Sequence, residues 1–263
     1  MLLRTEQLTK AFGGLQAVNA VDFELRESEV AAIIGPNGSG KTTFFNILSG
    51  VLPATAGKVF FKDEDVTARK AHEMTGRGMA RTFQNIRLFQ NLTVHDNVVV
   101  GRYSRTASGL WDGILRSSRL CEEERENRAQ VEALLSFVGL KAHSDTMAKH
   151  LPYGAQRRLE IARALASDPA LLMLDEPAAG MNPKEVDDLL GLVRQLTARG
   201  LTILVIEHQM RLVMGIAERV VVFDSGMKIA EGSPQEVRTN PKVIEAYIGI
   251  EGQHLARRKR HQR

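Results

Sequence analysis

The sequence has very little cysteine, few aromatic side chains and no long apolar run, and each shortage excludes a class of protein. A single cysteine, Cys121, rules out an internal disulfide framework and fits a reducing compartment. Aromatic residues make up 5% of the chain, which argues against a surface that stacks nucleic-acid bases, so we expect no nucleic-acid partner. No apolar run approaches the ~20 residues that span a bilayer, and the charged side chains within residues 1–10 argue against a signal peptide. If the protein works at a membrane, we expect it to work from outside the lipid.

Basic residues are concentrated at the end of the chain. The net charge is +4, yet residues 257–263 hold five basic side chains, and without them 30 basic residues face 31 acidic ones. The body of the chain is therefore nearly neutral, and its 43% hydrophobic and 25% charged residues are typical of a globular protein. We expect residues 251–263 to form a flexible basic tail, with contact to anionic lipid headgroups or an acidic partner as the alternative.

Residues 35–42 match the phosphate-binding template G-x-x-x-x-G-K-[ST] at every fixed position. The apolar residues 30–34 predict a buried strand before the loop, and residues 43–48 predict a helix after it, which is the context that the motif requires. Glycines let the N–H groups of the loop turn inward, and the helix N-terminus adds about half a positive charge. Lys41 would then reach the β- and γ-phosphates, and Thr42 would bind Mg²⁺ through its hydroxyl. The predicted nucleotide-binding residues of this loop are Gly35, Pro36, Asn37, Gly38, Ser39, Gly40, Lys41, Thr42 and Thr43.

Two acidic residues follow a fully apolar predicted strand at residues 171–174. An isolated Asp-Glu pair usually marks a solvated strand end, but this strand is too apolar for a sheet edge and lies downstream of a phosphate loop. Asp175 would orient Mg²⁺ through its water shell, and Glu176 would accept a proton from an attacking water. The pair therefore predicts the second half of a nucleotide site.

Polar residues also follow two other predicted strands. Gln84 follows residues 79–83, and His208 comes soon after the apolar residues 201–206. Either residue alone would be weak evidence, because a lone histidine is more often structural than catalytic. Ligands of open α/β sheets bind at the carboxyl ends of the strands, so we expect both side chains at the edge that carries the phosphate loop.

The rest of the chain alternates between strand and helix patterns, which predicts the α/β class. Strands at 2–8 and 20–25 flank a predicted turn that holds Phe12, which is either a core residue or a ring that stacks on a nucleotide base. Residues 85–150 predict a helical insertion, with Trp111 in a loop as either a docking anchor or a buried residue. Further predicted elements are a strand at 56–62, helices at 71–77, 94–100, 122–137, 156–166 and 183–198, a hairpin at 220–230 and a capped helix from 233.

With these residues placed, residues 2–248 resemble an ATP-binding cassette ATPase. Residues 35–42 look like its Walker A loop, and residues 171–175 look like Walker B with Glu176 as the catalytic carboxylate. The resemblance implies a P-loop NTPase fold with a mixed sheet core, an N-terminal antiparallel β subdomain and an inserted α-helical subdomain. It also implies ATP and Mg²⁺ as the cofactors. The implied domains are an ATPase domain at 1–250, with its helical subdomain at about 86–160, and the tail at 251–263.

Other family motifs follow in the family's order. Gln84 resembles the Q-loop glutamine, His208 the switch histidine and Phe12 the aromatic A-loop residue, while residues 178–182 occupy the D-loop. Residues 151–156 stand where the family signature reads L-S-G-G-Q, a segment that caps the nucleotide on a second subunit. The signature residues implied to act on that second subunit are Pro152, Tyr153, Gly154, Ala155 and Gln156.

Longer stretches are similar to the ATP-binding subunits of branched-chain amino acid importers. They lie at residues 76–89, 156–163, 175–185 and 240–249. ATP-binding subunits for urea, short-chain amides or lipopolysaccharide look much the same in these stretches. The resemblance implies a homodimer or heterodimer of ATPase subunits, transmembrane permease partners and, indirectly, an external solute-binding protein. It also implies a peripheral location on the cytoplasmic face of the inner membrane.

The chain departs from the family pattern at three positions. Pro152 replaces the signature serine, so it lacks the hydroxyl implied to touch the γ-phosphate, and it has no N–H to donate. Ala155 lacks the usual side-chain amide, so we expect the other subunit's nucleotide to be held by Gly154, nearby N–H groups and a helix N-terminus. Asn182 stands where the D-loop usually has aspartate, so we expect its contact with the other subunit to be neutral.

Three other functions compete with transport as interpretations of the sequence. A P-loop GTPase would need an Asn-Lys-x-Asp motif, and the sequence has none. Among non-transport cassettes, the DNA-repair type inserts a long coiled coil and the ribosome type has two cassettes, which leaves an iron–sulfur assembly component open. A regulatory module that binds ATP without hydrolysing it is disfavoured by Glu176 and His208 but kept open by Pro152.

Overall fold

The computed structural model describes residues 1–103 and 118–247. The expected tail at 251–263 and the loop that holds Trp111 lie outside the described residues. None of the helices in the described ranges combines the length and the apolar character needed to cross a bilayer.

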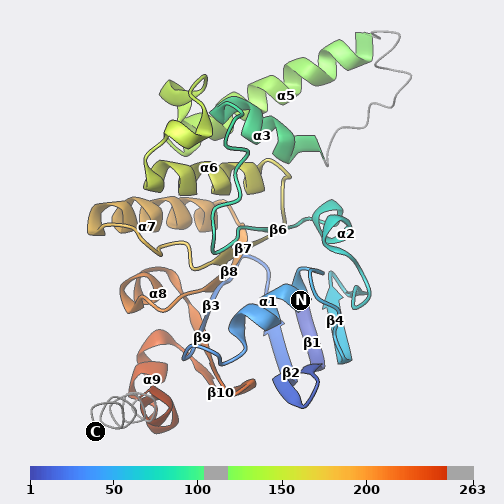
Figure 1. The fold of residues 1–263 in the computed structure, drawn as a ribbon, viewed down its shortest axis with the longest axis vertical. Helices are drawn as coiled ribbons and strands as arrows, with labels where there is room; N and C mark the ends of the chain where they lie inside the picture. The colour runs from blue at the N-terminus through green and yellow to red at the C-terminus, as the bar shows by residue number, and fades with distance from the viewer. Residues whose placement is uncertain (104–117, 248–263) are drawn as a thin grey trace, which may run out of the picture. The chain divides into compact units, whose positions relative to one another are not determined.

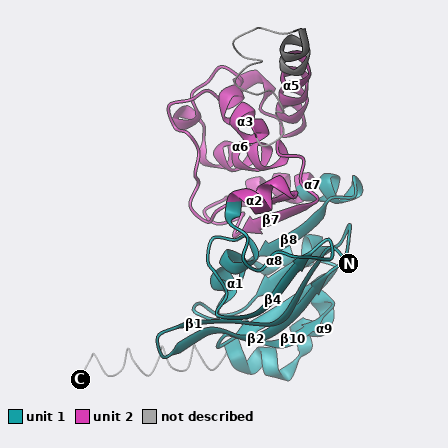
Figure 2. Cartoon of the chain, turned by 90° about the vertical axis from the view of Figure 1, so that its right-hand side faces the viewer, with its two compact units in different colours: residues 1–71, 193–263 teal, residues 72–192 magenta. Residues whose placement is uncertain are grey.

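The chain forms two compact units (Figure 2). Unit 1 is built from residues 1–71 and 193–263, and unit 2 from residues 72–192. Unit 1 therefore contains both ends of the chain, while unit 2 is one continuous stretch between them. The predicted phosphate loop and His208 belong to unit 1, whereas the Q-loop, Walker B, signature and D-loop segments belong to unit 2.

An antiparallel sheet forms the first part of unit 1. Its strand order is β2-β1-β4-β5, with β1 at Leu3–Phe12, β2 at Leu15–Leu25, β4 at Ala56–Phe61 and β5 at Glu64–Asp65 (Figure 1). Strands β1 and β2 are longer than the predicted strands, because the turn between them shrinks to two glycines. The turn predicted around Phe12 was therefore placed too early, since Phe12 is the last residue of β1.

A second sheet in unit 1 has the order β10-β9-β3-β8. Strands β3 (Val30–Ile34) and β8 (Thr202–Ile206) are parallel and buried along their whole length, as their apolar sequences predict. Strand β9 (Arg219–Asp224) runs parallel to β3 and forms the predicted hairpin with β10 (Met227–Gly232). The parallel core and its antiparallel hairpin together make a mixed sheet.

Helix α1 (Lys41–Leu48) links the two sheets of unit 1 through one buried aromatic residue. The ring of Phe44 lies 5.7 Å from the ring of Phe23 on β2, edge to face, and 5.2 Å from the ring of Phe223 on β9. All three rings are buried, so the helix that follows the phosphate loop is fixed by the core on both sides.

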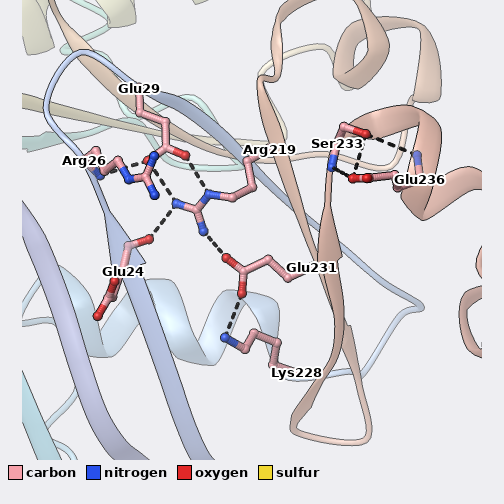
Figure 3. A network of polar contacts seen from close by, with 8 residues as sticks. All are labelled: Glu24, Arg26, Glu29, Arg219, Lys228, Glu231, Ser233 and Glu236. Carbon is pink, nitrogen blue, oxygen red and sulfur yellow. Dashed lines mark hydrogen bonds and ion pairs between the residues drawn. The ribbon is translucent and has the colours of Figure 1, made fainter.

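A network of polar contacts connects the same two sheets at another point (Figure 3). The Arg219 guanidinium donates to both carboxylate oxygens of Glu29, at 2.6 and 3.0 Å, and to the Glu24 carbonyl oxygen at the end of β2, at 2.7 Å. It also pairs with Glu231 on β10, which accepts a hydrogen bond from Lys228 at 2.8 Å. One arginine on β9 thus joins the segment at residues 24–29 to the β9–β10 hairpin.

Unit 2 combines a short parallel strand pair with several helices. Strand β6 (Met79–Arg81) pairs with β7 (Leu171–Asp175), and β6 ends two residues earlier than predicted. The helices are α2 (Ala71–Gly76), α3 (Val94–Arg102), α5 (Ser118–Phe137), α6 (Tyr153–Leu165) and the part of α7 (Pro183–Ala198) up to residue 192. Helices α3 and α6 pack closely, since a Cβ at Gly101 would lie 2.2 Å from the Arg163 carbonyl oxygen.

The expected fold class is confirmed, while some elements were missed or misplaced. Helix α6 begins at Tyr153, inside the signature segment, and not at residue 156. Helix α8 (Met210–Ile216) was not predicted, whereas the capping box of α9 (Pro234–Thr239) forms as expected, with the Ser233 side chain accepting from the Glu236 N–H. Two single turns of 3₁₀ helix, at Lys141–His143 and Ala148–His150, lie in the helical insertion.

Candidate functional site

The phosphate loop lies between β3 and α1 in unit 1. Gly38 and Gly40 have φ angles of 81° and 98°, which only glycine adopts at low cost. A Cβ at Gly40 would lie 2.2 Å from the Ala17 carbonyl oxygen, so the loop approaches β2 too closely for a larger residue. Gly40 directly precedes α1, whose first N–H groups therefore open onto the loop. This backbone has the conformation that a phosphate cradle needs.

Lys41 lies inside the curve of the loop. Its Nζ donates to the carbonyl oxygens of Gly35 and Pro36 at 2.8 Å each, and it lies 3.4 Å from the Ser39 Oγ. The residue is only 7% exposed, so its ammonium group presents a concentrated positive charge to the interior of the loop. The side chain of Thr42, the next residue, is exposed.

Two segments from the end of the chain also contact the phosphate loop. The Gly226 N–H donates to the Ser39 carbonyl oxygen at 3.0 Å, and Tyr247 interacts with the backbone of Gly35. Burial raises the pKa of Tyr247, and the hydrogen bond with the Gly35 backbone lowers it less. A cavity of about 520 Å³ lies between the loop and this segment, with Lys242 and Glu245 in its lining. The similarity at residues 240–249 was the only sequence signal for this contact.

Phe12 and His208 both have exposed side chains in unit 1. Phe12 is 47% exposed, with the Lys10 Nζ 5.2 Å from its ring centroid, so its interpretation as a core residue is wrong. His208 follows β8, and its backbone N–H donates to Glu207 Oε2 at 3.0 Å. The buried Glu207 carboxylate thereby fixes the backbone that carries the histidine. The roles of the two rings at the nucleotide stay predictions.

Unit 2 brings the Q-loop and Walker B residues together. The Gln84 Nε2 donates to the Glu176 Oε2 at 2.9 Å. Glu176 follows β7 with a φ of 45°, a left-handed conformation that costs about 1 kcal/mol or more for a residue with a Cβ. Such strain is typical of functional positions, and here it turns the carboxylate out of the strand direction.

Asp175 forms a buried ion pair that the sequence did not indicate. The Arg81 Nη2 lies 2.7 Å from the Asp175 Oδ2, and the two side chains are only 6% and 3% exposed. Burial lowers the pKa of Arg81, while the hydrogen bond and charge of Asp175 oppose that shift. Arg81 is the last residue of β6 and Asp175 the last of β7, so the parallel pairing sets their distance.

The signature segment forms the first turn of α6. Pro152 occupies the N-cap position and supplies no side-chain hydrogen bond, so the first N–H groups of the helix have no hydroxyl cap. Gln156 turns back within its own segment, where its Nε2 donates to the Leu151 carbonyl oxygen at 2.9 Å. A Cβ at Gly154 would lie 2.4 Å from Glu185 Oε1, so a larger residue there would displace the Glu185 side chain.

The D-loop asparagine caps α7 within its own subunit. The Asn182 Oδ1 accepts from the N–H groups of Lys184 and Glu185 at 3.0 and 3.1 Å, and the Asn182 N–H donates to Glu185 Oε2 at 2.9 Å. This reciprocal arrangement is a capping box, and it confirms the predicted start of the helix. An aspartate at position 182 would cap the helix equally well, because Asn and Asp are equally good N-cap residues.

The oxygen groups predicted to hold Mg²⁺ have suitable chemistry. A threonine hydroxyl, an amide oxygen and a carboxylate are hard oxygen ligands, which Mg²⁺ prefers, usually with several waters and substrate phosphates. Thr42 lies in unit 1, whereas Gln84 and Asp175 lie in unit 2. Among the described residues there is no group of three His, Cys, Asp or Glu side chains that could form an all-protein cage. The donor set therefore fits a metal held largely by nucleotide and water.

The predicted site residues thus form two sets, one in each unit. Unit 1 contributes the cradle, Lys41 and an exposed histidine, which suit the binding of a triphosphate. Unit 2 contributes a carboxylate held by a glutamine, together with a helix N-terminus that has no side-chain cap. The first set can bind and polarise phosphates, and the second can orient a water and present N–H groups to an anion.

Family models, curated relatives and solved structures that match this chain are ATP-binding cassettes or subunits of ABC transporters. Residues 18–179 match the family model of the ABC transporter, and residues 227–252 match that of the branched-chain amino acid ATP-binding cassette transporter. The high-affinity branched-chain amino acid transport ATP-binding protein LivG of Salmonella typhimurium is 43% identical, over 94% of this chain and 98% of its own. A crystal structure of an ABC transporter cassette in its ADP conformation has a TM-score of 0.82 and 34% identity, covering 94% of this chain and 98% of that one. A dimeric cassette bound to ADP and Pi has a TM-score of 0.75 and 25% identity, covering 89% and 99%.

Proposed function

The chain belongs to the ABC transporter ATPase family, and we propose that it is the ATP-hydrolysing subunit of a branched-chain amino acid importer. The observation that carries hydrolysis is the contact of Gln84 with Glu176, directly after the strand that bears Asp175. The 43% identity to LivG and the match at residues 227–252 support the choice of solute. The match covers 98% of that relative's length.

In the proposed reaction, the loop at 35–42 holds the triphosphate. Lys41 and the N–H groups at the start of α1 stabilise negative charge on the β- and γ-phosphate oxygens. Glu176 accepts a hydrogen bond from the attacking water and takes its proton as the water oxygen bonds to the γ-phosphorus, while the bond between the γ-phosphorus and the β–γ bridging oxygen breaks and ADP leaves. His208 contacts the γ-phosphate and steadies the transition state. Mg²⁺, when bound through Thr42, Gln84 and Asp175, supplies further charge neutralisation.

Two subunits complete each site in this proposal. The dimeric cassette described above, which is bound to ADP and Pi, supports a dimer for this chain. We place the N-terminus of α6, with the signature residues 152–156, against the nucleotide of the other subunit. Its uncapped N–H groups suit a phosphate oxygen, because the helix N-terminus carries partial positive charge. The second subunit is either identical to this chain or a related ATPase.

The permease partner would dock on the helical part of unit 2. A groove of about 330 Å³ lies there, lined partly by Phe89, Val100 and Arg163. Phe89 and Val100 are 49% and 41% exposed, which is high for apolar side chains on one surface. Arg81 and Glu160 also line the groove, so an occupant would touch residues that contact the catalytic segment. A permease helix in this groove would place the protein on the cytoplasmic face of the membrane, with an external solute-binding protein on the other side.

Solute uptake tests the proposal directly. We expect the wild-type chain, expressed with its permease and binding protein, to support ATP-dependent uptake of labelled leucine, isoleucine and valine into vesicles. Glu176→Gln should bind ATP normally and nearly abolish turnover and uptake, because an amide cannot take the proton. Full turnover by this variant would refute the catalytic assignment. Uptake of urea or an amide in place of leucine, or co-purification with a soluble scaffold, would refute the proposed solute class.

The docking groove has its own test. Val100→Glu introduces a charge into the groove and should abolish co-purification with the permease while leaving ATPase activity of the isolated subunit unchanged. Val51→Glu is the matched control, since Val51 is 45% exposed in unit 1. Normal permease binding by Val100→Glu would contradict the proposed docking surface.

A further inference from the structure

We propose that Arg157 is a positioning residue for ATP hydrolysis, because it joins the signature helix to the Q-loop and, through Tyr153, to the D-loop. The inference rests on the proposed role of Glu176 and concerns the residues that hold Gln84 against it. All of the contacts lie within unit 2.

Arg157 binds the backbone of the Q-loop from α6. Its Nη1 donates to the Phe83 carbonyl oxygen at 2.7 Å, and its Nη2 donates to the Gln84 carbonyl oxygen. The side chain is only 2% exposed, so these hydrogen bonds form away from water and are costly to break. The planar guanidinium holds two successive carbonyl groups, which fixes the direction of the chain at Gln84.

Glu160, one helical turn later, completes the attachment. It accepts a hydrogen bond from Arg157 Nη1 at 3.0 Å and is 1% exposed. Its other oxygen lies 3.3 Å from the Phe83 N and 3.4 Å from the Arg87 N, and both N–H groups donate to it. The pair therefore satisfies donors and acceptors on both sides of Gln84. A buried pair held by this many partners fixes one arrangement of the loop.

Tyr153 extends the same link to the D-loop. Its hydroxyl accepts from Arg157 Nη2 at 3.2 Å, and the guanidinium carbon lies 5.7 Å from the ring centroid. On its other side the ring meets Gly180, where a Cβ would lie 3.3 Å from the Tyr153 Cε1. Tyr153 stands where the family signature has a glycine, so its ring adds a contact that a glycine cannot make.

The consequence is a mechanical link between two nucleotide sites. The first turn of α6, which faces the other subunit's nucleotide in the proposed dimer, moves with Arg157. Any shift of that turn reaches the Gln84 carbonyl group through the guanidinium, and the Gln84 side chain is 2.9 Å from Glu176. Occupancy of one site would thus set the geometry of the carboxylate in the other. Arg157 and Glu160 act through Gln84 and do not touch the reacting atoms.

The test separates positioning from folding. The double variant Arg157→Gln/Glu160→Gln removes both charges together, so that neither is left buried without its partner. We expect kcat to fall about 10- to 100-fold, since small misplacements of catalytic groups cost that much. The affinity of the isolated subunit for a fluorescent ATP analogue should stay unchanged, because the phosphate loop lies in unit 1. Arg128→Gln/Glu132→Gln is the matched control, an exposed pair on α5 with the same charge change.

Arg157→Lys keeps the charge beside Glu160 but replaces the planar fork of two nitrogens by one ammonium group on a shorter reach, which cannot reproduce the paired hydrogen bonds to the Phe83 and Gln84 carbonyl groups. We expect it to restore the melting temperature if the double variant loses stability, while kcat stays low. Wild-type kcat in folded Arg157→Lys, or recovery of kcat in parallel with stability, would overturn the inference and leave a purely structural role. Glu176→Gln is measured alongside, so that turnover by that variant counts against the proposed function and not against the Arg157 link.

Discussion

Replacing Arg219 with methionine should destabilise unit 1 by about 2–3 kcal/mol. The change removes the bidentate pair with Glu29 and the contacts with Glu231 and the Glu24 carbonyl (Figure 3). Breaking a fully buried pair costs about 3–5 kcal/mol and an exposed one about 0–1 kcal/mol. The Arg219 and Glu29 side chains are 21% and 10% exposed, which places this pair between the two limits and closer to the buried one.

The effect should depend on pH in a defined direction. Burial alone would raise the pKa of Glu29, but hydrogen bonds from Arg219 and from the Arg26 N–H, with the charge of Arg219, lower this pKa below its ordinary value. Glu231 behaves in the same way: burial raises its pKa, but the hydrogen bonds and charges of Lys228 and Arg219 lower it by more, so its pKa lies below the ordinary value. A lowered carboxyl pKa stabilises the fold at pH values above the unfolded pKa, and this stabilisation is lost as the pH falls through the folded value.

Urea unfolding of wild type and Arg219→Met at pH 7 and near pH 4 measures both effects. We expect the difference in unfolding free energy between wild type and Arg219→Met to be largest at pH 7 and smaller near pH 4, because the carboxylates become protonated as the pH falls. Lys58→Met is the control, because the Lys58–Asp65 pair is 3.8 Å long and its side chains are 60% and 47% exposed. Equal losses in the two variants, or a gap that does not narrow with acid, would refute the reasoning.

Three further predictions concern the nucleotide site. Pro152→Ser should supply the side-chain cap that α6 lacks, stabilise unit 2 by about 1 kcal/mol and lower the KM for ATP in the dimer. An unchanged midpoint of urea unfolding would contradict the predicted stabilisation. Gly154→Ala should displace the Glu185 side chain and break the 2.9 Å hydrogen bond that Glu185 Oε2 accepts from the Asn182 N–H. We expect the loss of this cap to destabilise α7 by about 1 kcal/mol, measured in a thermal melt. Tyr247→Phe should remove the interaction of its hydroxyl with the Gly35 backbone and weaken ATP binding about fivefold, the equivalent of about 1 kcal/mol. Tyr103→Phe, at an 82% exposed tyrosine, should leave ATP binding unchanged.

Local sequence patterns predicted those parts of the site that depend on backbone conformation. The glycine spacing of the phosphate loop, the apolar run of β7 and the Asn182-Pro183 start of α7 each reflect a nearby physical requirement, and each forms as predicted. The capping box at Ser233 is the same kind of signal, since donor and acceptor lie within one turn.

The contacts missed from the sequence join residues that lie far apart. Arg81 and Asp175 are separated by 94 positions, and only the parallel pairing of β6 with β7 brings them together. Arg157 lies 74 positions from Phe83, and an arginine after the signature could equally have been a solvated charge on the face of a helix. No periodicity marks such a partner, because its position depends on how the helices pack.

The altered signature is understandable once α6 is seen to begin at Tyr153. In this position, residue 152 is the N-cap and residues 153–155 provide the first N–H groups of the helix, so a phosphate can be bound by backbone alone. The side chains of the segment are then available for contacts within the subunit. The Tyr153 hydroxyl accepts a hydrogen bond from Arg157, and its ring packs on Gly180. Gln156 donates a hydrogen bond to the Leu151 carbonyl oxygen. In the proposed dimer a serine hydroxyl at position 152 would add one contact to the nucleotide, whereas Tyr153 connects the first turn of α6 to the Q-loop through Arg157, an arrangement that would favour communication between the two sites over tighter binding at either one.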